Sequence, residues 1–120
     1  MKGLIQSFRY AIQGFRAAVL RERNLKIHLL AMAVAFVLAV WLGFTPTELA
    51  VLTLVCALVI TFELINTAIE AVIDLACPEQ NPLAGFAKDV AAAAVFVSAL
   101  AAVVCALVLY LPYLKNLMGS

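Results

Sequence analysis

Long stretches without a charged residue dominate the sequence. One of them, LAVLTLVCALVITF at residues 49–62, is long enough to form most of a membrane-crossing helix. The composition agrees, since 67% of the residues are hydrophobic and 12% are charged, whereas a soluble domain is about half apolar and about a quarter charged. The sequence therefore predicts a single all-α membrane domain over residues 1–120.

A basic, amphipathic segment precedes the first apolar stretch. Over residues 1–26, apolar side chains recur on one face of a helix, and basic and amide side chains recur on another. Six of the eight basic residues lie here: Lys2, Arg9, Arg16, Arg21, Arg23 and Lys26. Such a helix lies in the membrane interface, packs on the protein's own membrane helices, or does both.

Three membrane-spanning helices follow. We expect them over residues 29–45, 47–76 and 86–111. Pro46 can begin the second helix and Thr45 can cap it. We expect the segment with Pro78 and Pro82 to end the second helix and Pro112 to end the third, because proline cannot continue a helix within the usual hydrogen-bond pattern.

The distribution of lysine and arginine predicts the orientation. The N-terminal segment is rich in basic residues, the loop before the third span carries Lys88, and the turn over residues 43–48 has none. The positive-inside rule then places the N-terminus and the 77–88 loop in the cytoplasm. Because three spans bury little surface by themselves, we also expect a homo-oligomer.

Four polar side chains interrupt the end of the second span. Glu63, Asn66, Glu70 and Asp74 are spaced by three, four and four residues, so they share one face of a helix. Glu63 directly follows the apolar run, and an ionisable group at that depth indicates a functional site. The alternatives are structural: Glu63 can be a buried partner of Lys88 or of an arginine, and Asp74 can be a solvated carboxylate where the helix leaves the membrane.

Other polar residues lie at the same end of the predicted bundle. Lys88 and Asp89 precede the third span and Glu22 precedes the first. Carboxylates with a lysine suit Mg²⁺ and phosphate, although Glu22 alone is better explained by an ion pair with a neighbouring basic residue. His28, at the mouth of the first span, is interpreted as an interfacial residue rather than a ligand. No glycine-rich loop of the soluble nucleotide-binding type is present.

The segments ELINTAIEAVID and NPLAGFAKDVAAAAV, together with the size and the three spans, resemble one known family. This is the family of small bacterial integral-membrane lipid kinases, the prokaryotic diacylglycerol kinases and undecaprenol kinases. The resemblance covers nearly the whole chain. It implies a homotrimer in the bacterial cytoplasmic (inner) membrane, with active sites shared between subunits. It also implies transfer of the γ-phosphate of ATP to a lipid hydroxyl.

The same resemblance assigns roles to individual residues. Glu63 matches the general base that takes the hydroxyl proton, and Asn66 matches a residue that orients the site. Glu22 and Glu70 match the carboxylates that hold Mg²⁺ with the ATP phosphates. The residues that match positions near the nucleotide are Tyr10, Lys88 and Asp89.

The lipid acceptor is a separate question. The stretch RERNLKIH, the form NTAIE and the stretch AKDVAAAAV look more like undecaprenol kinases of Gram-positive bacteria. Gram-negative diacylglycerol kinases have Gly-Ser where this chain has Ala91 and Ala92. Undecaprenol is therefore the expected acceptor and diacylglycerol the alternative. Two other classes stay open on the residues alone: a proton- or cation-coupled transporter that uses Glu63 as a relay, and a non-enzymatic assembly subunit.

Overall fold

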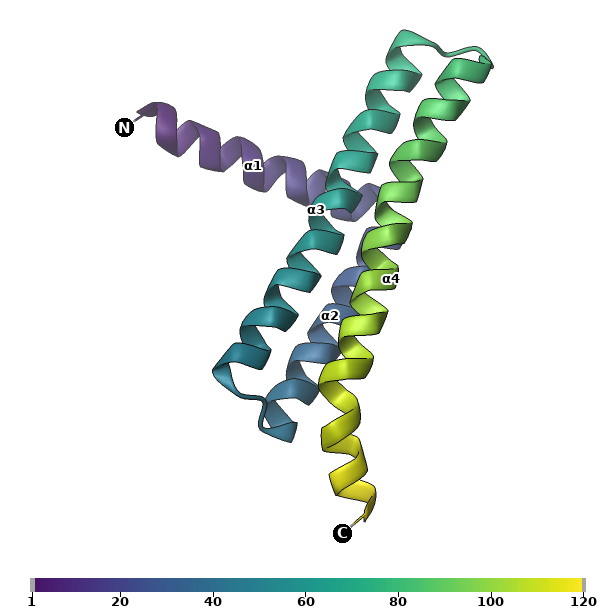
Figure 1. Cartoon of the computed structure of the whole chain (residues 1–120). Coiled ribbons are helices and arrows are strands. Elements are labelled where there is room, and N and C mark those ends of the chain that lie inside the picture. Colours follow the sequence, from purple (N-terminus) through teal and green to yellow (C-terminus); the bar gives the residue numbers. More distant parts are fainter. Residues whose placement is uncertain (1, 120) are drawn as a thin grey trace.

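The computed structural model describes residues 2–119; Met1 and Ser120 lie outside the described part of the chain. Its elements are α1 (Lys2–Arg21), α2 (Arg23–Leu42), α3 (Pro46–Ala76) and α4 (Pro82–Gly119), as Figure 1 shows. The helices α2, α3 and α4 are each long and apolar enough to cross a membrane. The expected all-helical membrane fold, with a separate N-terminal helix, is confirmed.

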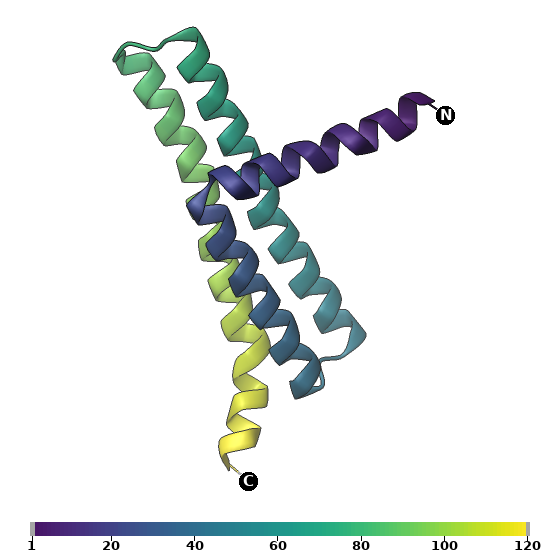
Figure 2. The same cartoon turned by 180° about the vertical axis from the view of Figure 1, so that it is seen from behind.

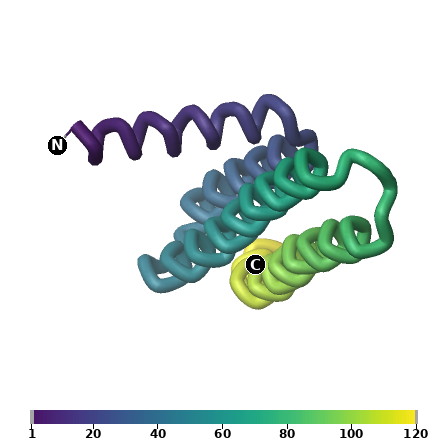
Figure 3. Tube along the Cα trace, turned by 90° about the horizontal axis from the view of Figure 1, so that it is seen from above, coloured from purple at the N-terminus to yellow at the C-terminus, as the bar shows by residue number. Residues whose placement is uncertain are grey.

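Helix α3 is the centre of the bundle. It packs against each of the other three helices, and its most extensive interface is with α4. Seen from above, α3 lies between α2 and α4 (Figure 3). Helix α1 leaves the bundle sideways, about halfway along α3, in both side views (Figures 1 and 2). The α3–α4 hairpin therefore extends beyond the level of α1 on one side.

Local sequence signals explain most helix ends. The side chain of Thr45 accepts a hydrogen bond from the Glu48 N–H at 3.2 Å, and the Glu48 carboxylate accepts one from the Thr45 N–H at 2.8 Å. This capping box satisfies N–H groups that a helix start leaves free. The Oδ1 atom of Asn81 accepts from the N–H of Leu83 at 2.9 Å at the start of α4. Gly43 ends α2 with a φ of 83°, a conformation that glycine adopts at little cost.

The first two helices divide at a different place from the one expected. Helix α1 ends at Arg21, Glu22 has extended backbone angles, and α2 begins at Arg23 rather than at residue 29. Hydropathy marks where apolar residues begin, whereas a helix can begin several polar residues earlier. The resulting α2 has 20 residues, which is about the length that a bilayer crossing needs.

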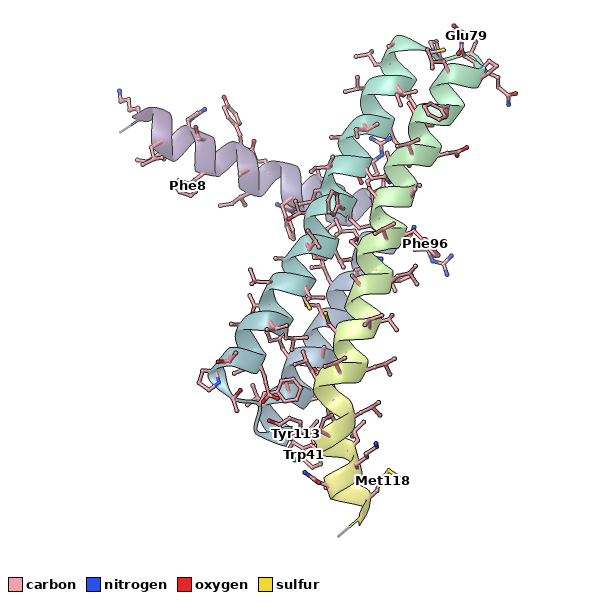
Figure 4. All side chains as sticks on the ribbon, in the orientation of Figure 1. Phe8, Trp41, Glu79, Phe96, Tyr113 and Met118 are labelled. Carbon is pink, nitrogen blue, oxygen red and sulfur yellow. The ribbon has the colours of Figure 1, made fainter. Side chains whose placement is uncertain are left out.

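The expectation that Pro112 ends the last helix is wrong, because α4 continues through it to Gly119. A proline removes one backbone hydrogen bond, and membrane helices tolerate this where neighbouring groups support the chain. Here the ring of Phe44 lies 4.7 Å from that of Tyr110 and 4.9 Å from that of Tyr113. The Tyr113 hydroxyl also donates to Glu48. Figure 4 shows Tyr113 beside the α2–α3 turn. These contacts hold α4 on both sides of the proline.

Candidate active site

Three carboxylates from two parts of the chain lie near one another. Glu63, in the second half of α3, is buried with 4% of its surface exposed. Glu22 lies in the break between α1 and α2, and Glu70 lies two turns beyond Glu63 on α3. Both are close enough for their charges to act on the Glu63 carboxylate. The structure thus brings together three of the residues that the sequence predicted for the site.

The depth of this cluster follows from its relation to α1. Glu22 directly follows α1, so the cluster lies at the level where that helix leaves the bundle. Phe8 projects from α1 toward the side on which the α2–α3 turn lies (Figure 4). An amphipathic helix places such an apolar face toward lipid. The cluster is therefore at the boundary between the apolar part of the bundle and the hairpin that extends beyond α1.

The partner of Glu63 is neither of the two that the sequence suggested. Its Oε1 atom lies 3.1 Å from Nε2 of His28, whereas the structural alternative considered from the sequence was a pair with Lys88 or an arginine. His28, near the start of α2, is correspondingly half-buried, with 30% of its side chain exposed. Burial of a carboxylate requires a polar partner, and α2 supplies one.

Asn66 connects the levels of Glu63 and Glu70. Its Nδ2 atom donates to Oε1 of Glu70 at 3.3 Å. Its Oδ1 atom is buried and has no hydrogen-bond partner within residues 2–119. Buried acceptors in native proteins are nearly always satisfied. An amide oxygen in this position fits a donor or a cation that arrives with a ligand.

Lys88 pairs with the outermost carboxylate of the stripe. Its Nζ atom lies 2.5 Å from Oδ1 of Asp74, across the α3–α4 hairpin. The charge of Glu70, one turn deeper, also acts on Lys88. Lys88 and Asp74 both line a hollow of about 630 Å³ beside the loop that joins the two helices. Asp74 is therefore an ion-pair partner, rather than a carboxylate that only contacts solvent.

Two predicted residues lie apart from the cluster in the single chain. Tyr10 is exposed on α1, where its hydroxyl accepts a hydrogen bond from Nε2 of Gln6 at 3.0 Å. Asp89 is exposed on α4. Within residues 2–119, no contact joins either side chain to the three carboxylates. The ion pair that the sequence suggested for Glu22 is also present: the Oε1 atom of Glu22 lies 3.7 Å from Nε of Arg21.

The donor set is compatible with a cation that also binds a second ligand. Among residues 2–119, no group of three or more histidine, cysteine, aspartate or glutamate side chains is arranged to hold a metal by itself. Mg²⁺, however, is commonly held by one or two carboxylates together with substrate phosphates. Glu22, Glu70 and the unsatisfied oxygen of Asn66 are donors of this kind.

An apolar groove begins beside the cluster. It has a volume of about 270 Å³ and is lined by residues of α2, α3 and α4. His28 lies among its lining residues, and so does Tyr110 near the opposite end of the bundle. The groove thus runs from the level of the Glu63 partner into the part of the bundle that the membrane surrounds.

Residues 9–110 match the family model described as prokaryotic diacylglycerol kinase. The chain belongs to this family. The match covers all three apolar helices up to Tyr110 and includes every predicted site residue. The resemblance stated from the sequence is confirmed, and so is the enzyme class, because this is a family of lipid kinases.

Relatives in the family carry two different names. A diacylglycerol kinase of Synechocystis is 41% identical over 116 residues, which is 96% of this chain and 66% of that protein. A diacylglycerol kinase of Escherichia coli K12 is 35% identical over 101 residues, 84% of this chain and 83% of that one. An undecaprenol kinase of Bacillus subtilis is 33% identical over 109 residues, 91% of this chain and 89% of that one. The chain thus spans slightly less than two thirds of the Synechocystis protein.

Proposed function

We propose that this protein transfers the γ-phosphate of ATP to the hydroxyl group of a membrane lipid. The observation that carries this proposal is the buried Glu63, which lies beside two further carboxylates at the level of the amphipathic helix. Family membership favours the kinase over the transporter and the assembly subunit that the residues alone left open.

Glu63 acts as the general base in this proposal. The lipid hydroxyl gives its proton to the Glu63 carboxylate while its oxygen bonds to the γ-phosphorus, and the bond from that phosphorus to the ADP oxygen breaks. Phosphoryl transfer depends mainly on positioning and on neutralising negative charge. A carboxylate at the apolar boundary can meet a lipid hydroxyl there without drawing the lipid out of the membrane.

Mg²⁺ with ATP is the proposed ligand of the neighbouring carboxylates. Glu22 and Glu70 hold the cation, and Asn66 orients Glu70 through the hydrogen bond between them. When bound, the cation neutralises charge on the phosphates. Lys88 contacts a phosphate after release from Asp74, and Tyr10 and Asp89 contact the nucleotide. Because those last two residues are exposed in one chain, we propose that a homotrimer completes the site with residues of a neighbouring subunit.

The proposed acceptor is diacylglycerol, which the Synechocystis and Escherichia coli relatives have in their names. Undecaprenol is the second candidate. It is supported by the name of the Bacillus subtilis relative and by Ala91 and Ala92, which stand where Gram-negative diacylglycerol kinases have Gly-Ser. The apolar lining of the groove beside His28 suits hydrocarbon, which both lipids contain. The proposed location is the bacterial cytoplasmic membrane with the N-terminus in the cytoplasm, as the distribution of basic residues predicts.

A lipid panel tests the proposal. The protein in detergent micelles is given Mg²⁺, ATP labelled at the γ-phosphate, and either diacylglycerol, undecaprenol or no lipid. We expect label in at least one lipid, and a loss of about 100-fold or more in the Glu63→Gln variant at unchanged oligomeric state, because general base catalysis contributes about 10²–10⁴-fold. Absence of lipid labelling with every acceptor would exclude the kinase. Full activity of Glu63→Gln would exclude Glu63 as the base.

A further inference from the structure

The proposed mechanism does not use the contact between His28 and Glu63. The Nε2 atom of His28 lies 3.1 Å from Oε1 of Glu63, which is hydrogen-bond distance. Within residues 2–119, His28 is the side chain that contacts this carboxylate, and the contact is through Oε1. The two carboxylate oxygens therefore have different surroundings.

Packing of α2 against α3 determines where His28 lies. Leu25 and Ala39 on α2 are fully buried, and Met32 and Ala35 between them are partly buried. Together with His28 these residues follow a spacing of three or four, so they form one face of the helix. The histidine is the single polar member of that face. Its ring is therefore held at a defined depth by the helix packing.

We propose that His28 is a positioning residue for Glu63. It donates a hydrogen bond from Nε2 to Oε1, and this leaves Oε2 as the oxygen that receives the proton of the lipid hydroxyl. An orienting hydrogen bond of this kind selects one rotamer of a flexible side chain and presents one lone pair to the substrate. The role rests on the proposed function, because it presumes that Glu63 is the base, but the contact itself is independent of activity.

Substitutions of His28 test the role kinetically. We expect His28→Leu to lower kcat by about 10- to 100-fold, by analogy with residues that orient metal ligands through a hydrogen bond, with less than a twofold change in KM for ATP and for lipid. A glutamine amide nitrogen reaches about as far as Nε2, so His28→Gln should retain at least a third of the kcat. Asn24→Leu, an exposed change one turn earlier on α2, is the control and should leave kcat unchanged.

A second background separates positioning from a structural effect. In Glu63→Asp the side chain is one methylene shorter, so we expect its carboxylate to lie beyond hydrogen-bond distance of His28. We expect His28→Leu to change kcat by less than twofold in that background, because the contact is already lost. An equal loss in both backgrounds, an equal loss in His28→Gln and His28→Leu, or an unchanged kcat in His28→Leu would each overturn the proposal.

Nuclear magnetic resonance tests the contact without turnover. His28 is the only histidine, so protein labelled with ¹⁵N-histidine gives signals from this ring alone. We expect a proton on Nε2, and an upfield shift of that proton signal in Glu63→Gln, because an amide oxygen accepts more weakly than a carboxylate. An unprotonated Nε2, or a signal that Glu63→Gln does not move, would overturn the pairing. If the lipid panel shows no kinase activity while this shift occurs, the proposed function fails and the contact stands.

Discussion

At the scale of single residues, the site consists of groups with different surroundings along one helix face. Glu63 is buried against a histidine, Glu70 accepts a hydrogen bond from an asparagine, and Asp74 is bonded to a lysine. In the proposed function, a general base has to reach the lipid hydroxyl, whereas a metal ligand has to reach the cation that binds the phosphates. The gradient from buried to exposed carboxylate supplies both within about 16 Å of helix.

The proposed cation site predicts a change in the dependence on Mg²⁺. We expect Glu22→Gln and Glu70→Gln each to raise the Mg²⁺ concentration for half-maximal activity by about tenfold or more, because an amide oxygen is a weaker ligand than a carboxylate. Titration of kinase activity with Mg²⁺ at constant ATP measures this. Glu79→Gln, at the tip of the hairpin loop (Figure 4), is the matched control. A common Mg²⁺ dependence in all three variants would rule out the assignment.

At the scale of helices, the ends of α3 show how local chemistry limits each span. Thr45 and Glu48 satisfy each other's N–H groups, and the same Glu48 carboxylate accepts a bond from Tyr113 on α4. The cap thus connects the start of α3 to the last helix. This connection stabilises α4 at the point where Pro112 interrupts its backbone hydrogen bonds.

Loss of the cap should destabilise the bundle without changing the chemistry. We expect Thr45→Ala to lower the free energy of unfolding by about 1 kcal/mol, the usual effect of removing a side-chain cap. Unfolding with sodium dodecyl sulfate in mixed micelles, followed by circular dichroism, measures the difference. Thr47→Ala, two residues later and exposed, should have a smaller effect. Equal destabilisation by the two changes would show that the cap contributes nothing.

At the scale of the whole molecule, the position of the amphipathic helix α1 predicts where the membrane surface lies. Helix α1 leaves the bundle where the cluster lies, so the α3–α4 hairpin and its loop extend to one side of that surface. The α2–α3 turn lies at the other end of the bundle. The proposed orientation places the hairpin loop in the cytoplasm and this turn outside.

Thiol labelling tests that orientation. Cys77 lies at the start of the hairpin loop, while Cys56 and Cys105 lie within the spans. In intact cells a membrane-impermeant maleimide should leave Cys77 unmodified and should modify a cysteine introduced by Thr47→Cys. Inverted membrane vesicles should give the opposite pattern. The reverse result in the two preparations would place the N-terminus outside.

The rate of Cys77 labelling should depend on pH in a defined direction. Burial, with the neighbouring Glu79, holds the pKa of the Cys77 thiol above its usual range. Only the thiolate reacts, so a raised pKa leaves less of the reactive form at neutral pH. Labelling in inverted vesicles should therefore be slower than that of an exposed model thiol at pH 7, and should continue to accelerate above about pH 8.5, the usual midpoint. Equal rates of Cys77 labelling at pH 7 and above about pH 8.5 would contradict this prediction.

Local patterns in the sequence were sufficient for the membrane helices, for the cap at Thr45, and for the shared face of Glu63, Asn66 and Glu70. Each of these depends on residues within a few turns of one another. Hydropathy and the period of the helix therefore contain the necessary information. The depth of Glu63 was also predictable, because its distance along the helix from the start at Pro46 is a matter of counting residues.

Only the tertiary structure decided which helices meet at the site. Glu22 lies near Glu63 only because the helices pack in this way, and the same packing makes His28 rather than Lys88 the partner of Glu63. Contacts with Phe44 support α4 where it continues beyond Pro112. A helix that is apolar on every side has no periodic signal to show which face packs inward. Contacts between residues distant in sequence therefore depend on how the side chains of α2, α3 and α4 fit together.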